Sequence, residues 1–298
     1  MSKEEQEFLK GYNSNEFEKP SVTVDMLIFT VRDKEVDNYR KLPEKKLSLL
    51  LIKRKGHPYK DKWALPGGFV DMDESLEEAA IRELKEETNL DNIYMEQLYT
   101  WGDVDRDPRT RVISASYMAL VDSATLDIKA GDDAYEAKWF DVECKLYETT
   151  NKIEGATEKL IKKYNLVLTH KDITLSSKIE VTSIIKKGQN ATITSIIENN
   201  DIAFDHAKII RYGIDRLRNK IEYTDIAFNL MSDYFTLSEL QQVYEIILDK
   251  ELLRANFRRK IKPLVKETNK YQKENKGHRP SKLYKYNKDY YKGENNYE

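Results

Sequence analysis

The hydrophobic residues in the first two thirds of the chain occur in short runs rich in β-branched side chains. Residues 21–31 (SVTVDMLIFTV) and 47–53 (LSLLLIK) predict two strands separated by a charged loop. Further strand candidates follow at residues 94–101, 110–121, 137–142, 166–181 and 191–197. Because a helical segment separates the second run from the third, the pattern indicates a mixed α/β or α+β domain that continues to about residue 199.

The hydrophobic pattern changes period after residue 200. Ala207, Ile210, Ile214 and Leu217 lie at helical spacing and form one apolar stripe. We therefore predict two domains, a sheet-forming domain over residues 1–200 and a helical domain over residues 201–298.

The helix predicted inside the first domain lies in the segment GGFVDMDESLEEAAIRELKEETNL, residues 67–90. Asp73 is a plausible N-cap, and the helix is expected to run from about residue 74 to residue 88. Leu76, Ala80 and Leu84 are predicted to form its buried side, because they lie four residues apart.

Three acids of this helix share one face. Glu83, Glu86 and Glu87 stand at i, i+3 and i+4, so that their like charges repel. Either they face water, as charged helix faces usually do, or a divalent cation such as Mg²⁺ or Mn²⁺ compensates the repulsion. Gly67 and Gly68 favour the second interpretation, since they allow the backbone to bend close to an ion. The spacing alone leaves both interpretations open.

Cysteine and histidine offer no alternative chemistry. The chain has one cysteine, Cys144, and four histidines, which excludes a disulfide framework and gives no cluster with zinc-site spacing. Any reaction chemistry is therefore expected to rest on carboxylates. The polar first twenty residues and the lack of a long apolar run predict a cytoplasmic protein with no membrane partner.

The acidic segment resembles the Nudix box, G-x5-E-x7-R-E-U-x-E-E-x-G-U, in which U is apolar. Gly68 and Glu74 begin the match, and Arg82-Glu83-Leu84-Lys85-Glu86-Glu87-Thr88-Asn89-Leu90 completes it. The one departure is Asn89, which stands where the family has glycine. A residue at this helix end usually adopts a positive φ, and asparagine tolerates that conformation best after glycine.

The resemblance implies a Nudix α/β/α sandwich that hydrolyses a nucleoside diphosphate linked to another moiety. It implies Mg²⁺ or Mn²⁺ ligation by Glu83, Glu86, Glu87 and the Gly68 carbonyl, with Arg82 and Glu74 holding the loop–helix–loop in shape. The expected catalytic residues are therefore Arg82 and the same three glutamates. The general base stays open among Glu86, Glu87, Asp132, Asp133 and Glu136.

A polar loop at residues 101–112 contains two arginines that suit bidentate contacts to a pyrophosphate, Arg106 and Arg109. The alternative is an ordinary hydrophilic turn. The RDPR sequence at residues 106–109 resembles a segment of ADP-ribose-binding Nudix proteins, which implies ADP-ribose or a related nucleoside diphosphate derivative as ligand. The expected substrate-binding residues are Arg106, Arg109, Gly67 and Asp133.

Charge separates the two parts of the chain. Residues 1–200 contain 30 Lys and Arg against 37 Asp and Glu, whereas residues 201–298 contain 20 against 15. Residues 254–288 alone contain 13 basic and 2 acidic residues. A basic surface of this kind suits contacts to DNA phosphates, although a basic helix by itself is more often only solvated.

The basic stretch has the pattern of a helix–turn–helix. Thr236 and Glu239 have capping-box spacing and predict the start of one helix. A second helix follows, with Leu253, Phe257 and Ile261 on its apolar side. Three arginines of this second helix are left facing solvent, Arg254, Arg258 and Arg259. Residues 277–286 (GHRPSKLYKY) predict a hairpin arm that returns to the sheet.

Taken together, the box and the C-terminal pattern resemble the Nudix-related transcriptional regulators of NAD metabolism over nearly the full chain. The resemblance implies an ADP-ribose sensor and a winged helix–turn–helix that binds double-stranded operator DNA as a homodimer. It also implies that ligand binding releases the DNA. Arg254, Arg258 and Arg259 would contact DNA, and His278 and Arg279 would lie in the wing.

Three functions are compatible with these features. The first is a Mg²⁺-dependent ADP-ribose pyrophosphatase, and the second is a ligand-responsive DNA-binding regulator. A protein with both capacities fits best, because the box is nearly complete and the winged helix is basic. The third is a sugar-responsive regulator without hydrolase activity, and the retained carboxylates count against it.

Overall fold

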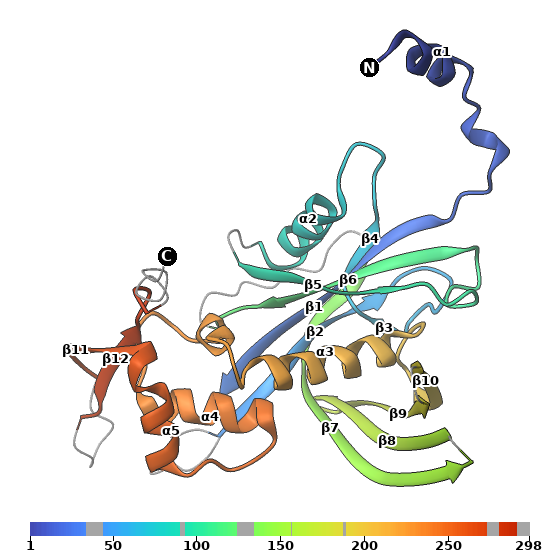
Figure 1. The fold of residues 1–298 in the computed structure, drawn as a ribbon. Coiled ribbons are helices and arrows are strands. Elements are labelled where there is room, and N and C mark those ends of the chain that lie inside the picture. The colour runs from blue at the N-terminus through green and yellow to red at the C-terminus, as the bar shows by residue number, and fades with distance from the viewer. Residues whose placement is uncertain are drawn as a thin grey trace.

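The computed structural model describes residues 1–33, 44–89, 93–123, 134–155, 157–186, 189–272 and 280–290. It has three layers, with a large twisted sheet between one helix on one face and a longer helix on the other (Figure 1). A group of helices and a small two-stranded sheet follow at the C-terminal end, and an N-terminal arm extends away from the body (Figure 1).

The central sheet has ten strands, and eight of them follow the order β10-β9-β8-β7-β2-β1-β6-β5. Their bounds are β1 Ser21–Asp33, β2 Lys45–Arg54, β5 Tyr94–Trp101, β6 Val112–Leu120, β7 Ala134–Glu154, β8 Thr157–His170, β9 Ile173–Lys186 and β10 Gln189–Asn200. Two short strands, β3 (Trp63–Ala64) and β4 (Gly67–Phe69), pair with β2 and β1. β1 and β6 run parallel, and six of the seven strand candidates are confirmed. The seventh, residues 166–181, covers the end of β8 and the start of β9, with a turn at residues 171–172 between them.

Strand β1 contributes to the two hydrophobic cores on either side of the sheet, because its side chains alternate between the two faces. Met26 and Ile28 pack with α2 (Leu76–Thr88) on one face, whereas Leu27 and Phe29 pack with α3 (His206–Lys220) on the other. A strand buried on both sides appears as a nearly continuous apolar run, as in residues 21–31. The structure therefore confirms the predicted α/β/α sandwich.

Helix α3 joins the sheet to the C-terminal helices. Its predicted apolar stripe is buried, and Gly213 allows close packing, since a Cβ there would lie 2.4 Å from Cδ2 of Leu27. Near its C-terminus, Arg218 Nε donates to the Ile247 carbonyl at 3.0 Å and Nη1 to the Cys144 carbonyl at 3.2 Å. The domain division at residue 200 stays a prediction, and the helix that follows it packs on the sheet.

The C-terminal part contains η3 (Ile226–Leu230), α4 (Leu237–Leu248), α5 (Arg254–Ile261), η4 (Lys262–Leu264), β11 (Val265–Tyr271) and β12 (Lys282–Tyr286). The capping box of Thr236 and Glu239 is confirmed at the start of α4. Phe257 and Ile261 are buried as predicted, but Leu253 is wrong as a buried residue, because it is 74% exposed at the N-cap of α5.

The described part of the predicted hairpin arm, residues 280–286, contains a strand, although its partner differs from the prediction. β12 pairs antiparallel with β11 in a separate two-stranded sheet and does not return to the central sheet. The hairpin packs against the C-terminal helices through Tyr284, whose backbone exchanges two hydrogen bonds with that of Phe235. Helix, turn, helix and hairpin thus form one winged unit.

The N-terminal arm comprises α1 (Lys3–Gly11) and η1 (Ser14–Glu16), and neither contains a buried residue. None of the helices in the described part of the chain combines the length and the apolar composition that a membrane span requires.

Candidate functional site

The acidic segment folds as a loop, the helix α2 and a second turn. The helix begins later than predicted: Ser75, and not Asp73, is the N-cap, and its side chain accepts from the backbone of Glu78 while Glu78 bonds back to Ser75. A capping box satisfies two N–H groups at the helix start, which explains why Ser75 takes this position. Leu76 is consequently the first helical residue and is 37% exposed, so its predicted burial is wrong.

The two glycines before the helix are required by close approaches. A Cβ on Gly67 would lie 2.1 Å from the Val24 carbonyl oxygen of the neighbouring strand β1. A Cβ on Gly68 would lie 2.3 Å from Oε1 of Glu83. The missing side chains therefore let β4 pair with β1 and let the Glu83 carboxylate lie against the backbone.

Arg82 holds the loop and the helix together. Its guanidinium binds both carboxylate oxygens of Glu74 at 2.8 and 3.1 Å and donates to the Phe69 carbonyl at 3.2 Å. It also contacts Glu83 at 2.7 Å and Glu86 at 3.5 Å. The hydrogen bonds from Arg82 hold the pKa of the Glu74 carboxyl below its usual value. These are the positions at which the family resemblance implies a structural role.

The three glutamates of α2 differ in exposure. Glu83 and Glu87 are buried, whereas the side chain of Glu86 is 54% exposed. Burial raises the pKa of the Glu83 carboxyl, and the hydrogen bond from Arg82 opposes this effect. Ala80, one turn earlier, is fully buried against the sheet. The small side chain thus brings the helix close to the strands.

The chemistry of these donors suits Mg²⁺ or Mn²⁺, because carboxylates and a backbone carbonyl are hard oxygen ligands. The positions of these donors, however, do not form a complete metal-binding site. In the described part of the chain, no three side chains of His, Cys, Asp or Glu gather closely enough to hold a metal ion. Arg82 instead contacts two of the predicted ligands, Glu83 and Glu86.

Asn89 closes the helix in the conformation expected from the sequence. Its φ is 55° and its ψ is 27°, and its N–H donates to the Lys85 carbonyl at 2.7 Å. The left-handed conformation at the end of α2 is therefore preserved without the glycine of the family pattern.

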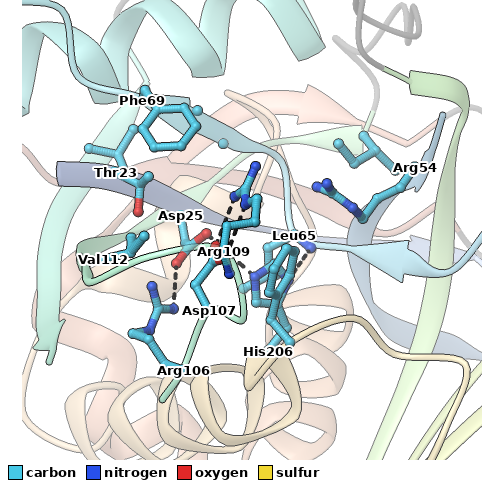
Figure 2. Close-up of a pocket in the computed structure, with 15 residues that line it drawn as sticks. Thr23, Asp25, Arg54, Leu65, Phe69, Arg106, Asp107, Arg109, Val112 and His206 are labelled. Atoms are coloured by element: carbon cyan, nitrogen blue, oxygen red, sulfur yellow. Dashed lines mark hydrogen bonds and ion pairs between the residues drawn. The ribbon is translucent and has the colours of Figure 1, made fainter. Parts of the chain in front are cut away.

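A cavity of about 180 Å³ lies beside the glycine loop (Figure 2). Gly67 and Gly68 of β4 form one side of it, and the 101–112 loop forms another with Arg106 and Arg109. The other lining residues are Thr23, Val24, Asp25, Ile52, Arg54, Leu65, Phe69, Asp107, Val112, Phe204 and His206. The cavity thus brings together three of the four residues predicted to bind substrate. The fourth, Asp133, lies outside the described residues.

Arg106 is held by acids of the protein itself. Its side chain is 5% exposed, and it binds both oxygens of Asp205 at 2.8 and 3.1 Å. It also binds one oxygen of Asp25 at 3.3 Å (Figure 2). Asp25 also accepts from Ser114 Oγ at 2.5 Å. Arg106 therefore ties the loop to β1 and to the residue that precedes α3.

Arg109 is the more accessible arginine, with a side chain that is 41% exposed. It forms a bidentate pair with Asp107, with distances of 2.8 and 3.0 Å. Its guanidinium lies over the rings of Phe69, at 5.4 Å, and Phe204, at 6.0 Å. A planar cation near two aromatic rings suits the binding of a phosphate and a base together.

The sequence interpretation missed His206, the first residue of α3. Its Nδ1 accepts the Leu65 N–H at 2.9 Å, so in the neutral ring the hydrogen lies on Nε2, which is 3.5 Å from Oδ1 of Asp25. Burial lowers the pKa of this histidine. Asp25 was missed as well, although an acid inside an apolar run, SVTVDMLIFTV, was a usable signal.

The basic helix α5 presents its arginines to solvent. Arg254, Arg258 and Arg259 are exposed, and none of them forms an ion pair with another described residue. Arg259 donates to Asn256 within the helix at 3.2 Å. The buried Phe257 and Ile261 anchor the helix in the core that includes α4. The three DNA-binding candidates of this helix are thus all accessible to a partner, and His278 and Arg279 lie outside the described residues.

Two family profiles match the chain. The NUDIX domain matches residues 32–156, and the NrtR DNA-binding winged helix domain matches residues 227–286. The ADPR responsive transcriptional repressor NtrR of Acinetobacter baylyi is 31% identical over 290 residues, covering 95% of this chain and 88% of the relative. The chain belongs to the NrtR family.

A solved NrtR structure extends this likeness to the fold. The Shewanella oneidensis NrtR complexed with a 27mer DNA superposes with a TM-score of 0.60 at 27% identity, over 90% of this chain and 94% of that one. The family assignment agrees with the described architecture, in which a Nudix sandwich precedes a winged helix.

The Nudix part of this NrtR-family chain also resembles an enzyme. The ADP-ribose pyrophosphatase of Methanocaldococcus jannaschii is 45% identical over 121 residues, covering 41% of this chain and 68% of the relative. The Nudix part is therefore similar both to a regulator and to an enzyme.

Proposed function

We propose that the protein is a transcription regulator of NAD metabolism, in which the Nudix domain binds ADP-ribose and the winged helix binds double-stranded operator DNA. The observation that carries this proposal is the exposed, uncompensated arginine surface of α5, on a winged helix that α3 joins to a Nudix sheet with a cavity. The names of the full-length relatives support it.

The cavity offers the chemistry that ADP-ribose requires. Arg109 is bidentate to Asp107 through Nε and Nη2, but its side chain is 41% exposed, which leaves Nη1 for the pyrophosphate. Phe69 and Phe204 supply aromatic faces for the adenine. Arg106 was predicted to bind the ligand directly, but Asp205 and Asp25 already use its guanidinium. We assign it the role of holding the loop in place. Gly67 keeps the wall of the cavity free of side chains.

The DNA surface comprises Arg254, Arg258 and Arg259, and a homodimer would present two copies of it to a two-fold symmetric operator. Contacts of this kind release counterions from DNA, so the affinity falls steeply as the salt concentration rises. We expect ADP-ribose to lower the affinity of this surface for the operator.

The test uses the full chain and fluorescently labelled DNA from its own promoter region, at one fixed salt concentration. Titration with ADP-ribose is expected to lower the fluorescence anisotropy of the complex, whereas AMP and ribose 5-phosphate at equal concentrations serve as controls. Failure to bind this DNA contradicts the DNA assignment. A complex that ADP-ribose leaves intact contradicts the proposed response.

Hydrolysis of ADP-ribose is a second candidate function, favoured by the nearly intact box and by the contacts of Arg82 with Glu74 and Glu83. Mg²⁺ or Mn²⁺ would be held by Glu83, Glu86, Glu87 and the Gly68 carbonyl. A bound ion would neutralise the pyrophosphate and lower the pKa of a water molecule. Glu86 and Glu87 are the candidates on α2 for positioning that water, and Arg82 keeps the loop and helix in register around them.

Glu136 fits the role of general base less well. Its carboxylate pairs with Lys138, and this hydrogen bond holds the pKa of Glu136 below its usual value. Asp132 and Asp133, the other loop candidates, lie outside the described residues.

The assay for this second function mixes the purified protein with ADP-ribose and MgCl₂ and follows AMP and ribose 5-phosphate by chromatography. Turnover is expected in the wild type and a loss of about 100-fold or more in Glu87→Gln, since acid–base and metal-binding groups contribute on that order. Undiminished turnover in Glu87→Gln excludes the assignment of hydrolysis to this site. A sugar-responsive regulator without hydrolase activity would show no turnover and would release DNA with a sugar phosphate instead.

A further inference from the structure

Strand β10 forms a free edge of the central sheet. It is the last strand in the order β10-β9-β8-β7, and no described strand pairs with its outer side. Most of its residues are exposed, including Ile193 at 54% and Ile197 at 47%. The unpaired N–H and C=O groups of such an edge form a template for another strand.

This edge lacks the features that usually protect one. Proteins commonly protect edge strands with lysines, prolines or early bulges, because these interfere with pairing. Residues 189–197 (QNATITSII) contain no charged residue and no proline. The register with β9 is regular from Gln189 to Ile196, and the bulge follows only after Ile196.

The one charge of β10 is already compensated. Glu198 forms an ion pair with Lys178 of β9 at 2.9 Å. A second strand at this edge would therefore meet a neutral, β-branched surface, and a strand with the same properties is β10 of another copy of this chain.

We propose that β10 pairs antiparallel with β10 of a second copy of the chain, about a two-fold axis at Ile193. This inference deepens the proposed homodimer by naming its surface. In this register, Thr192 faces the partner's Thr194 and Ala191 faces the partner's Ser195, so no like charges oppose one another. Two isoleucines meet at the axis, where each gains an apolar neighbour.

The pairing extends an existing row of side chains. Ile161 of β8 faces Thr182 of β9, and Thr182 faces Ile193 of β10, so that all three lie on one face of the sheet. In the second copy, on the other side of the two-fold axis, the same three residues would continue the row in the order Ile193, Thr182 and Ile161. The four-stranded part β7–β10 of each copy then joins into a continuous eight-stranded sheet, and cross-strand β-branched pairs stabilise its centre.

Sedimentation equilibrium of the full chain tests the proposal. The wild type is expected to be a dimer, and Ile193→Lys is expected to raise the dimer dissociation constant about tenfold or more, because two ammonium groups then face each other at the axis. Ile153→Lys is the matched control: Ile153 is an isoleucine of β7 that is 75% exposed and lies away from the β10 edge. Circular dichroism verifies that both variants fold.

Cross-linking checks the register separately. Ile193→Cys is expected to form a disulfide between copies under mild oxidation, and Ile153→Cys is not; the native Cys144 is buried and does not compete. A monomeric wild type, a dimer that Ile193→Lys leaves intact, or equal losses in both lysine variants would overturn the inference. These experiments measure neither DNA binding nor the response to ADP-ribose. If they overturn the β10 interface, the proposed function is still tested separately by the anisotropy experiment.

Discussion

The two functional helices of the molecule, α2 and α5, differ in where their charges are compensated. Arg82 of α2 contacts Glu74, Glu83 and Glu86, so the positive charge of this arginine is compensated within the fold. In α5 the arginines are exposed and form no ion pair with another described residue. A helix whose charges pair internally stabilises a site, whereas a helix with uncompensated charge depends on a partner.

The largest expected effect follows from removing the uncompensated charge. Replacing Arg258 and Arg259 together by alanine is expected to weaken operator binding about 30-fold or more, since each arginine contact to DNA contributes about 1–3 kcal/mol. Folding should be unaffected, because both side chains are exposed. Fluorescence anisotropy at constant salt measures the change.

The matched control removes two positive charges elsewhere, by Lys152→Ala and Lys186→Ala on the exposed strands β7 and β9. If both double variants lose the same affinity, only the net charge matters, and α5 is not the DNA-binding surface.

A smaller effect, on stability, is expected from Arg82→Gln. The variant leaves Glu83 buried without its positive partner, and we expect the free energy of unfolding to fall by about 2 kcal/mol. This loss is below the range of about 3–5 kcal/mol for fully buried pairs, because the Arg82 side chain is 33% exposed. Urea unfolding measures the loss. Lys85→Gln, which removes an exposed charge from the same helix, is the control.

The pH dependence of this loss has a definite sign. Burial raises the pKa of Glu83 in the folded state, and removing Arg82 raises it further. Protonated Glu83 needs no positive partner, so the destabilisation is expected to be small at a pH below the raised pKa and to grow as the pH rises through it. A loss that is larger at low pH would contradict this origin.

The smallest effect concerns the end of α2. Asn89→Ala is expected to destabilise the protein by about 1 kcal/mol, because alanine disfavours the φ of 55° found there, whereas Asn89→Gly should stay within about 0.5 kcal/mol of the wild type. Asp249 ends α4 with a φ of 52° and provides the comparison, since Asp249→Ala should behave alike. Thermal unfolding of the three variants would show whether the two helix ends are equivalent.

The sequence predicted the parts of the molecule whose interactions are local. The capping box at Thr236, the left-handed Asn89 and the buried stripe of α3 all depend on residues within a few turns. The same reasoning failed at helix starts, where Ser75 replaced Asp73 as N-cap and where Leu253 proved exposed. At a helix start, several neighbouring residues can serve as the N-cap, and the sequence alone does not specify which of them does.

The cavity could be predicted only in part. Arg106 and Arg109 were found because their loop carries a recognisable sequence, but the acids that hold Arg106 were not. Asp25 and Asp205 lie 81 and 99 residues away from Arg106 in the chain. Contacts of that separation depend on sheet topology, which the periodicity of one sequence does not specify.

Helix α3 also limits how this chain can change its length. Arg106 fixes its beginning through Asp205, and Arg218 fixes its end to the Ile247 carbonyl of α4. One inserted residue would rotate the end of the helix by about 100° and break the second attachment. Four residues would bring the rotation back to within about 40° but displace the winged helix by about 6 Å. The length of α3 is therefore expected to tolerate no insertion or deletion.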